Sequence, residues 1–259
     1  MKNNRRIVEE RQQKILQQVR EAGEIRTEEL SEQLGVSLMT LRRDLALLER
    51  RQLLRRTHGG AVSQERAHAL RVFSGETARC RELVSRYAAR FLEDGDRIYI
   101  NGSRVALNML QYAEEKRVRV FTNNGWAVGQ TYPAGVQVNL TGGEVQGNLM
   151  MGEYVVRNLL SAPQADKAFL GCAAVYESGE FRYDIPTEIS INEMMVSRTR
   201  GEIYVLAEHT KLQSHSSGHP GNGVTYDRRI TLITDSLADP EIVGSLRESG
   251  IGVILVPVR

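Results

Sequence analysis

The chain has 259 residues, of which 41% are hydrophobic and 25% are charged, and this balance is that of an ordinary globular protein. Its apolar runs are far shorter than a membrane span, and its first residues, MKNNRRIVEERQQ, lack the apolar segment of a secretory signal. Cys80 and Cys172 lie apart from each other and from any histidine pattern. We therefore expect no disulfide, no zinc module and no membrane partner, and we expect the cytoplasm as location.

Positive charge is concentrated toward the start of the chain. Residues 1–62 hold 13 Lys and Arg against 9 Asp and Glu, whereas acids are in slight excess over the remaining residues. Six arginines fall between Arg42 and Arg56, together with only two acids, Asp44 and Glu49. A local basic face on a chain that is nearly neutral overall predicts a polyanion as the partner of this segment alone.

Three helices are predicted within the first sixty residues. The first ends at Gly23, and the second begins with Thr27 as its N-cap and ends at Gly35. The third begins only a few residues later, with Ser37 as its N-cap. Two helices joined by so tight a turn are typical of a helix-turn-helix.

The third predicted helix has an apolar face and a cationic face. Leu41, Leu45 and Leu48 share one side, which we expect to dock on the other helices. The opposite side is suited to the major groove of DNA. That side carries Met39, Arg43, Ala46 and Arg50, with Arg42 and Thr40 on its flanks. The alternative is a solvated surface helix that merely carries charge.

A small hairpin is predicted directly after this helix. Its strands run over Leu53–Thr57 and Ala61–Val62, and the turn contains His58, Gly59 and Gly60. Such a hairpin forms a wing beside the recognition helix, and we expect its basic side chains to reach phosphates. The complete set of predicted DNA-binding residues is Ser37, Met39, Thr40, Arg42, Arg43, Arg50, Arg55, Arg56 and His58.

The stretch TEELSEQLGVSLMTLRRDLALLERRQLLRRTHGGAV resembles the winged helix-turn-helix of DeoR-type bacterial transcriptional regulators. The family signature is a recognition helix of the form Ser-x-x-Thr-hydrophobic-Arg-Arg-Asp-Leu and a wing of the form Arg-Thr-x-Gly-Gly. The residues that match it are Ser37, Thr40, Arg42, Arg43, Asp44, Leu45, Arg56, Thr57, Gly59 and Gly60. The resemblance implies that residues 1–62 form a DNA-binding domain.

Residues 63–76 are predicted to be a linker, and residues 77–259 a second domain that binds an effector and forms the oligomer. Strands are predicted at Arg97–Asn101, Val118–Asn123, Val136–Thr141, Lys167–Ala173, Ile203–Glu208, Ile230–Thr234 and Gly252–Val256. Helices are predicted at Thr77–Leu92, Val105–Glu115, Ala127–Tyr132, Tyr154–Leu160, Thr187–Thr199 and Pro240–Ser249. Their alternation predicts an α/β fold with a mainly parallel, Rossmann-like sheet covered on both faces.

Small and polar residues follow four of these strands. Ligands of open α/β sheets bind beyond the carboxyl ends of the strands, where small residues let backbone N–H groups approach an anion. We therefore predict an anion pocket, although glycine and asparagine are also ordinary turn residues. Its predicted residues are Asn101, Gly102, Ser103, Arg104, Asn123, Asn124, Gly142, Gly143 and Lys211.

The resemblance to DeoR-type regulators continues through "FLEDGDRIYINGS", "FTNN", "LTGGEV", "DKAFLGCAAV" and "VLAEHTKL". It implies a sensor domain similar to sugar-phosphate isomerases, with phosphorylated sugars or related metabolites as effectors. Glu188 matches the family's Glu-rich helix, which has no lysine in this chain. Asn101 replaces the family's usual acid and Arg104 a hydroxyl, and an extra guanidinium suits a more anionic or carboxylate-bearing effector.

We predict a repressor of a carbohydrate operon, controlled by an anionic effector and acting as a homodimer or homotetramer on double-stranded DNA. We expect no cofactor and no metal; for the loop containing His209, His215 and His219 a mobile surface loop, either a lid or plain surface, is favoured over a metal site. The main alternative is a phosphosugar isomerase or deaminase with a DNA-binding head. Against it, Asn101 stands where a carboxylate would serve proton transfer. A third possibility is a nucleoid-type DNA binder with a degenerate second domain.

Overall fold

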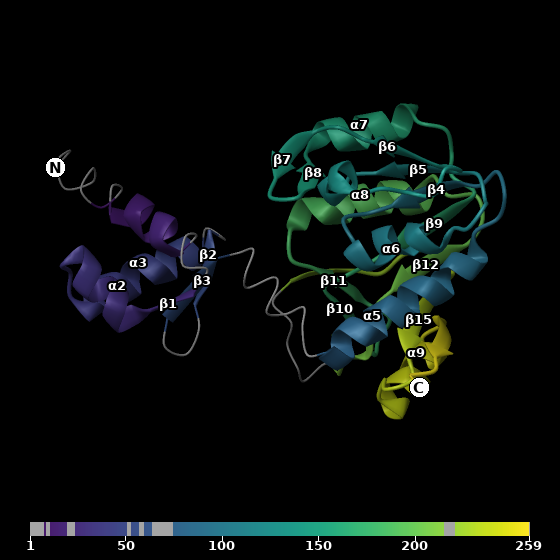
Figure 1. The fold of residues 1–259 in the computed structure, drawn as a ribbon. Helices are drawn as coiled ribbons and strands as arrows, with labels where there is room; N and C mark the ends of the chain where they lie inside the picture. Colours follow the sequence, from purple (N-terminus) through teal and green to yellow (C-terminus); the bar gives the residue numbers. More distant parts are fainter. Residues whose placement is uncertain are drawn as a thin grey trace. The chain divides into compact units, whose positions relative to one another are not determined.

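The computed structural model of the chain describes residues 8, 11–19, 24–50, 53–56, 60–63, 75–214 and 221–258. The chain divides into two compact units, Met1–Ser74 and Gly75–Arg259 (Figure 1). Most of the predicted linker, residues 64–74, lies outside the described residues. Among the helices of the described residues, none combines the length and apolar character needed to cross a membrane.

The first unit is a helix-turn-helix followed by a β-hairpin. Residues 11–19 are helical, and α2 (Thr27–Leu34) and α3 (Leu38–Arg50) follow. Strands β2 (Leu54–Arg56) and β3 (Gly60–Ser63) form the predicted wing. A strand that the sequence did not predict, β1 (Glu24–Arg26), pairs antiparallel with β3 and completes the sheet in the order β1-β3-β2.

Local caps set the helix ends in this unit. Gly35 ends α2 with φ 61°, the left-handed conformation that glycine adopts without strain. The oxygen of Ser37 accepts a hydrogen bond from the backbone N–H of Thr40 at 3.2 Å, so the predicted cap of α3 is confirmed. The prediction that Thr27 caps α2 is wrong, because Thr27 is already the first helical residue and Arg26 occupies the cap position.

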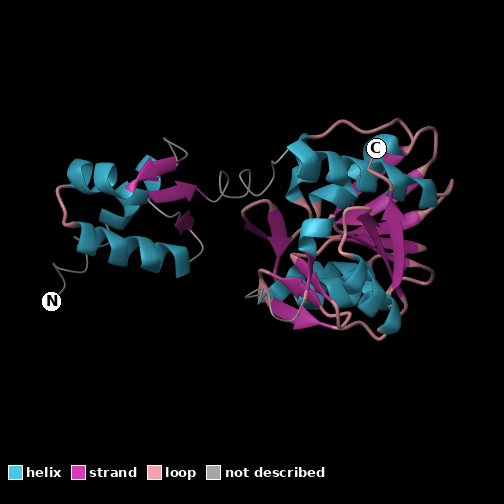
Figure 2. Cartoon of the chain, turned by 90° about the horizontal axis from the view of Figure 1, so that it is seen from below, coloured by secondary structure: helices cyan, strands magenta, loops and turns pink. Residues whose placement is uncertain are grey.

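The second unit is built on a seven-stranded sheet in which every neighbouring pair is parallel, with the order β16-β15-β12-β9-β4-β5-β6. Figure 2 shows these strands as a middle layer with helices on both sides. The strands are β4 (Arg97–Ile100), β5 (Val118–Thr122), β6 (Val136–Leu140), β9 (Lys167–Leu170), β12 (Ile203–Leu206), β15 (Ile230–Asp235) and β16 (Gly252–Val256). They correspond to the seven predicted strands, so the predicted fold class is confirmed.

Two hydrophobic clusters cover the two faces of this sheet, because successive side chains of a strand point in opposite directions. In β4, Ile98 and Ile100 belong to the cluster formed with α5 (Gly75–Ala88) and α6 (Arg104–Asn108). Tyr99 belongs to the cluster formed with α7 (Glu153–Ser161), α8 (Pro186–Ser197) and α9 (Pro240–Glu248). Burial on both faces explains why the central strands β9 and β12 are apolar runs in the sequence, whereas β5 and β6 alternate between apolar and polar residues.

Several elements differ from the prediction. The predicted helix Val105–Glu115 is the short α6 followed by the 3-10 helix η2 (Met109–Tyr112), and the predicted helix Ala127–Tyr132 is the 3-10 helix η3 (Gly125–Gly129). A hairpin and a second sheet, ordered β13-β10-β11-β14, were not predicted. These strands are β7 (Glu144–Gln146), β8 (Leu149–Met151), β10 (Ala174–Tyr176), β11 (Phe181–Tyr183), β13 (Leu212–Gln213) and β14 (Asn222–Val224).

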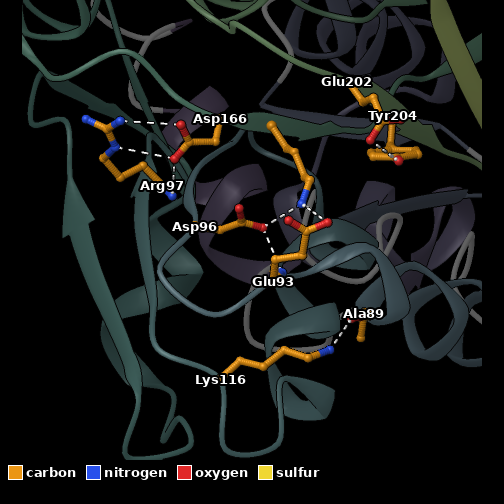
Figure 3. A network of polar contacts seen from close by, with 9 residues as sticks. Ala89, Glu93, Asp96, Arg97, Lys116, Asp166, Glu202 and Tyr204 are labelled. Atoms are coloured by element: carbon orange, nitrogen blue, oxygen red, sulfur yellow. Dashed lines mark hydrogen bonds and ion pairs between the residues drawn. The ribbon is translucent and has the colours of Figure 1, made fainter.

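A network of ion pairs neutralises the edge of the sheet where its strands begin (Figure 3). The buried amine of Lys167, the first residue of β9, lies 2.9 Å from Asp96 and 3.2 Å from Glu93. Arg97, the first residue of β4, pairs with Asp166. Lys167 and Arg97 therefore each have a carboxylate partner at this edge.

Candidate DNA interface and effector site

Helix α3 has a buried face and an outward cationic face. Leu41, Leu45 and Leu48 each expose 1% or less of their surface, so the predicted docking face is confirmed. Arg42 and Arg43 are exposed. Burial of the leucines fixes the rotation of the helix about its own axis, and this rotation presents both guanidinium groups to solvent.

The first turn of α3 is open to an anion. Ser37 and Thr40 hold their hydroxyl oxygens 2.9 Å apart, and Met39 exposes 69% of its surface. No acid lies in this turn. The positive end of the helix dipole is therefore not neutralised by a local carboxylate, which favours contact with a phosphate.

Asp44, one of the two acids within the cationic stretch, is turned inward. It exposes 5% of its surface and accepts hydrogen bonds from Arg11 at 2.6 Å and from Gln12 at 3.1 Å. Its negative charge is therefore removed from the outward face of α3 and neutralised by Arg11. Sequence reasoning missed Arg11 and Gln12, because they lie more than thirty residues away along the chain and no local pattern marks them.

The wing has the predicted pairing, with Arg55 opposite Val62 and Arg56 opposite Ala61. The side chains of Arg50, Arg55 and Arg56, and the whole of His58, lie outside the described residues, so their phosphate contacts stay predictions. Gly60 is required where it lies, because a Cβ there would collide with the backbone oxygen of Ile25 in β1. This close approach joins the wing to the helices.

In the second unit, the predicted loops meet at one edge because all seven strands run in the same direction. Asn101, directly after β4, is 4% exposed and all of its side-chain hydrogen-bonding capacity is used within the protein. Its Nδ2 donates to Gly171 O at 2.9 Å and to Asn192 Oδ1 at 3.1 Å. Its Oδ1 accepts from the N–H groups of Gly171 and Ser103. Asn101 therefore positions the neighbouring loops.

The loop after β5 is tied to the loop after β4. The Nδ2 of Asn124 donates to Ser103 O at 3.1 Å, and the Nδ2 of Asn123 donates to Met150 O at 3.1 Å. A Cβ on Gly102 would collide with a methyl group of Leu149 in β8, whose side chain would have to shift. The unpredicted hairpin β7–β8 thus lies against two of the predicted ligand-binding loops.

Gly142 and Gly143 form the third predicted loop. Both have positive φ, 70° and 118°, so L-residues would be strained at either position. A Cβ on Gly143 would also lie 2.6 Å from a methyl group of Val155 in α7. The glycines therefore permit a tight turn against α7, and a ligand contact by their backbone stays a prediction.

Charged groups from three elements gather around the end of β12. Glu208 is buried and pairs with Arg81 of α5, and the amine of Lys211 donates to Cys172 O at 2.6 Å. Burial opposes ionisation of Glu208, but the charges of Lys211 and Arg81 outweigh it and lower the pKa of Glu208. Sequence reasoning missed both Arg81 and Glu208 as site residues, although the place of Glu208 as the polar end of an apolar strand is a signal that could have identified it.

Glu188 lies within electrostatic reach of Lys211. Burial, and then the negative charge of Asp184, raise the pKa of Glu188 to about 7. Lys211 acts in the opposite direction and lowers this pKa. Helix α8 contains no lysine, but Lys211 from the segment after β12 lies close enough to act on Glu188. A pH change near neutrality alters the charge of Glu188.

Arg104 is the first residue of α6, the helix that follows β4. Its guanidinium carbon is 5.4 Å from the ring centroid of Trp126, whose side chain is 40% exposed and so is not part of the core. The Oγ of Ser103 accepts from the N–H of Ala106 and caps α6. The Oγ of Ser103 thus serves as the cap of the helix, and among the described residues no general base forms a hydrogen bond with this hydroxyl.

His209 is held by the sheet rather than by the loop that follows it. Its Nδ1 lies 2.8 Å from Asp235 Oδ1, and its backbone N–H donates to the other oxygen of Asp235. Cys80 completes a group whose possible metal-ligand atoms lie within 4.8 Å of one another. Burial, and then Asp235, raise the pKa of the Cys80 thiol to about 11, so the thiol is protonated at neutral pH. His215 and His219 lie outside the described residues.

Comparison with known proteins gives matches over nearly the whole chain. The DeoR-like helix-turn-helix domain matches residues 11–67, and the DeoR C terminal sensor domain matches residues 76–236. The chain is 28% identical to the uncharacterized HTH-type transcriptional regulator YulB of Bacillus subtilis, over 97% of this chain and 98% of that protein. It is 27% identical to the HTH-type transcriptional repressor GlcR of the same organism, over 95% and 96%.

A further relative is the lactose phosphotransferase system repressor of Staphylococcus aureus, which is 28% identical over 78% of this chain and 83% of that protein. Similar solved structures cover about half of the chain and about half of their own length. Ribose 5-phosphate isomerase A of Methanocaldococcus jannaschii is 15% identical with a TM-score of 0.39, over 52% of this chain and 55% of that chain. Chaetomium thermophilum eIF2B delta is 21% identical with a TM-score of 0.41, over 57% and 56%.

Proposed function

The chain belongs to the DeoR family of transcriptional regulators, and from this premise we propose that it is a repressor of a carbohydrate operon, controlled by an anionic, phosphorylated small molecule. Its relatives are transcriptional regulators and repressors, not enzymes. Relatives named for the lactose phosphotransferase system and the aga operon support a link to sugar uptake and use.

One observation carries the DNA-binding proposal: α3 exposes two neighbouring arginines, while Asp44, the acid next to them and one of the two acids of the helix, is withdrawn. Arg42 and Arg43 are exposed, whereas Asp44 is buried on Arg11. A helix of this kind, held by its leucines, can lie in the major groove with Ser37 and Thr40 at the phosphates and Arg43 at a base edge. The wing arginines then bind the adjacent backbone.

The second unit is proposed to bind the effector at the carboxyl edge of its sheet. Arg104, Lys211 and Glu188 lie there on loops and a helix that Asn101 and Asn124 hold in place. The effector acts on DNA affinity only if it binds better to one arrangement of the protein than to another. We propose at least a dimer, whose two recognition helices are brought into or out of register by this binding.

The DNA-binding proposal is tested with the full chain and duplexes selected by it from a random library. We expect Arg43→Ala to weaken binding of the best duplex by about 1–3 kcal/mol, the value of a bidentate arginine–guanine contact, as measured by fluorescence anisotropy. We also expect binding of the wild type to fall steeply with salt, because phosphate contacts release counterions.

The matched control is Arg119→Ala, which removes an exposed arginine of β5 in the second unit and should leave binding unchanged. Equal affinity of Arg43→Ala and the wild type would remove Arg43 from the interface. Failure of the wild type to enrich any duplex, even at low salt, would refute the proposed function.

A further inference from the structure

Asp235 differs from the other buried acids of the described residues in its partner. Asp44, Asp96 and Glu208 are buried, and each forms an ion pair with an arginine or a lysine. Asp235, at the end of β15, exposes none of its surface, and its ion-pair partner within the described part of the chain is the imidazole of His209. An imidazole is a cation only when it is protonated, so this buried carboxylate lacks a permanent positive charge beside it.

Asp235 is the centre of a group of three side chains that can each bind a metal. The Nδ1 of His209 lies 2.8 Å from Asp235 Oδ1, and the thiol of Cys80 is hydrogen-bonded to the same carboxylate. The possible ligand atoms of the three residues all lie within 4.8 Å of one another. Cys80 belongs to α5, His209 follows β12 and Asp235 ends β15, so the fold, and not spacing in the sequence, brings them together.

The chemistry and spacing of the group suit a zinc-like cation. Thiolate, imidazole and carboxylate are ligands of Zn²⁺ and of similar divalent transition metals. In a tetrahedral zinc site with bonds of about 2.0–2.3 Å, neighbouring ligand atoms lie about 3.3–3.6 Å apart. The group has one pair at 2.8 Å and no pair beyond 4.8 Å, which brackets this range. Three protein ligands leave a fourth position for water.

The same arrangement is unsuited to a cysteine nucleophile. Such a thiol gives its proton to an imidazole beside it, whereas here the carboxylate of Asp235 contacts both groups. Burial, and then the negative charges of Asp235, Glu76 and Glu208, raise the pKa of the Cys80 thiol to about 11. The carboxylates that hold one proton on the sulfur attract the double charge of a metal ion more strongly.

The group is withdrawn from water but can be reached from it. Cys80 and Asp235 expose none of their surface, whereas the side chain of His209 exposes 21%, so a cation can enter along the imidazole. Glu208 precedes His209 in the chain, and its Oε2 is buried without a hydrogen-bond partner among the described residues. A carboxylate oxygen of this kind can accept a hydrogen bond from a water molecule bound to a metal.

We propose that Cys80, His209 and Asp235 bind one divalent transition-metal ion of the zinc class, with water in the fourth position. On binding, the thiol releases its proton to solvent, His209 binds as the neutral imidazole and Asp235 as the carboxylate, and no electron is transferred. The metal joins α5 to the ends of β12 and β15 and stabilises the second unit, because it binds the folded state. This inference goes beyond the proposed function and does not depend on it.

The site is tested with the reduced, full-length protein after treatment with a chelator. It is titrated with Co²⁺, whose bond to a thiolate gives a charge-transfer band in the near ultraviolet and whose four-coordinate complexes absorb strongly in the visible. Zn²⁺ is then added, and its affinity is measured by competition with a chelating dye. We expect one equivalent of Co²⁺ to bind with both absorptions, Zn²⁺ to displace it, and Zn²⁺ to raise the Tm of the second unit.

The main variants are Cys80→Ser and His209→Gln, and circular dichroism checks that each is folded. Cys80→Ser should abolish the charge-transfer band. Both should weaken Zn²⁺ binding by at least about 100-fold, because changes in groups that only orient the ligands already weaken it by about 10–100-fold. The matched controls are Cys172→Ser, at the other buried cysteine, and the double variant His215→Gln/His219→Gln, and both should bind as the wild type does.

Failure of the folded wild type to bind either metal would overturn this inference. Binding without the charge-transfer band, or with equal affinity in Cys80→Ser, would exclude the sulfur as a ligand and overturn it as well. Binding that is lost in the double variant but kept in His209→Gln would assign the metal to His215 and His219 instead. The DNA test, carried out in chelator, stands apart from all of these outcomes.

Discussion

The amide of Asn101 allows a quantitative test of how the effector edge is held together. In Asn101→Asp, a carboxylate oxygen replaces the Nδ2 that donates to Gly171 O at 2.9 Å and to Asn192 Oδ1 at 3.1 Å. The side chain of Asn192 can turn its own Nδ2 toward the new oxygen, because that group has no hydrogen-bond partner among the described residues. The backbone oxygen of Gly171 can only accept hydrogen bonds, so in the variant it faces a negatively charged oxygen in a buried position.

The loss of stability in Asn101→Asp cannot exceed the free energy needed to protonate the introduced carboxyl group. A protonated carboxyl would restore the hydrogen bond to Gly171 O, and protonating an ordinary Asp at pH 7 costs about 4 kcal/mol, since each pH unit above its usual pKa of about 3.9 adds about 1.4 kcal/mol. The loss of a buried hydrogen bond and the burial of the charge together cost a similar amount. We therefore expect Asn101→Asp to lower the free energy of unfolding of the second unit by about 2–4 kcal/mol at pH 7.

The sign of the pH dependence follows from the same argument. The folded state raises the pKa of the introduced carboxyl, so stability is retained at low pH and lost as the pH rises through that pKa. The penalty should shrink by up to about 1.4 kcal/mol for each unit between pH 7 and pH 5. Denaturant unfolding followed by the fluorescence of Trp126, the single tryptophan, reports on the second unit.

Asn108→Asp makes the same chemical change at an exposed position of α6 and should alter the free energy of unfolding by less than about 0.5 kcal/mol. Equal destabilisation by the two substitutions, or a penalty at Asn101 that does not vary with pH, would refute the view that the Asn101 amide joins the loops after β4 and β9.

Three further predictions concern the two units. Leu45→Ala, at a side chain that is 1% exposed, should destabilise the first unit by about 2–5 kcal/mol and leave the unfolding of the second unit unchanged in circular dichroism. Asp44→Asn should cost the first unit about 1–3 kcal/mol through the loss of its charged pairing with Arg11, and less when Arg11 is already Ala; additive effects in this double-mutant cycle would contradict the pairing. The pKa of Glu188 is raised from 4.5 to about 7, so wild-type stability should fall by at most about 3 kcal/mol as the pH rises from 5 to 8, and Glu188→Gln should remove this component; identical pH profiles would show that Glu188 titrates normally.

The sequence determined the elements whose signal is local. The central strands of the parallel sheet, such as β9 and β12, were predicted because burial on both faces makes them apolar runs, and β5 and β6 because apolar and polar residues alternate in them. The cationic face of α3 was predicted because its leucines recur with the helical period and so fix which side faces outward. The small and polar residues after four of these strands then marked the loops at the carboxyl edge of the sheet, and the family resemblance agreed with them.

Tertiary structure alone decided which of these loop residues are available to a ligand. Asn101 resembles a binding residue in the sequence, but its amide is used on Gly171 and Asn192, 70 and 91 residues further along the chain. Arg104 lies over the ring of Trp126, which belongs to a different loop, and Asp44 is withdrawn from the outward face of α3 because it is buried on Arg11. The strands that were missed have two or three residues, too few for a periodic pattern, and hydrogen bonding between distant segments creates them.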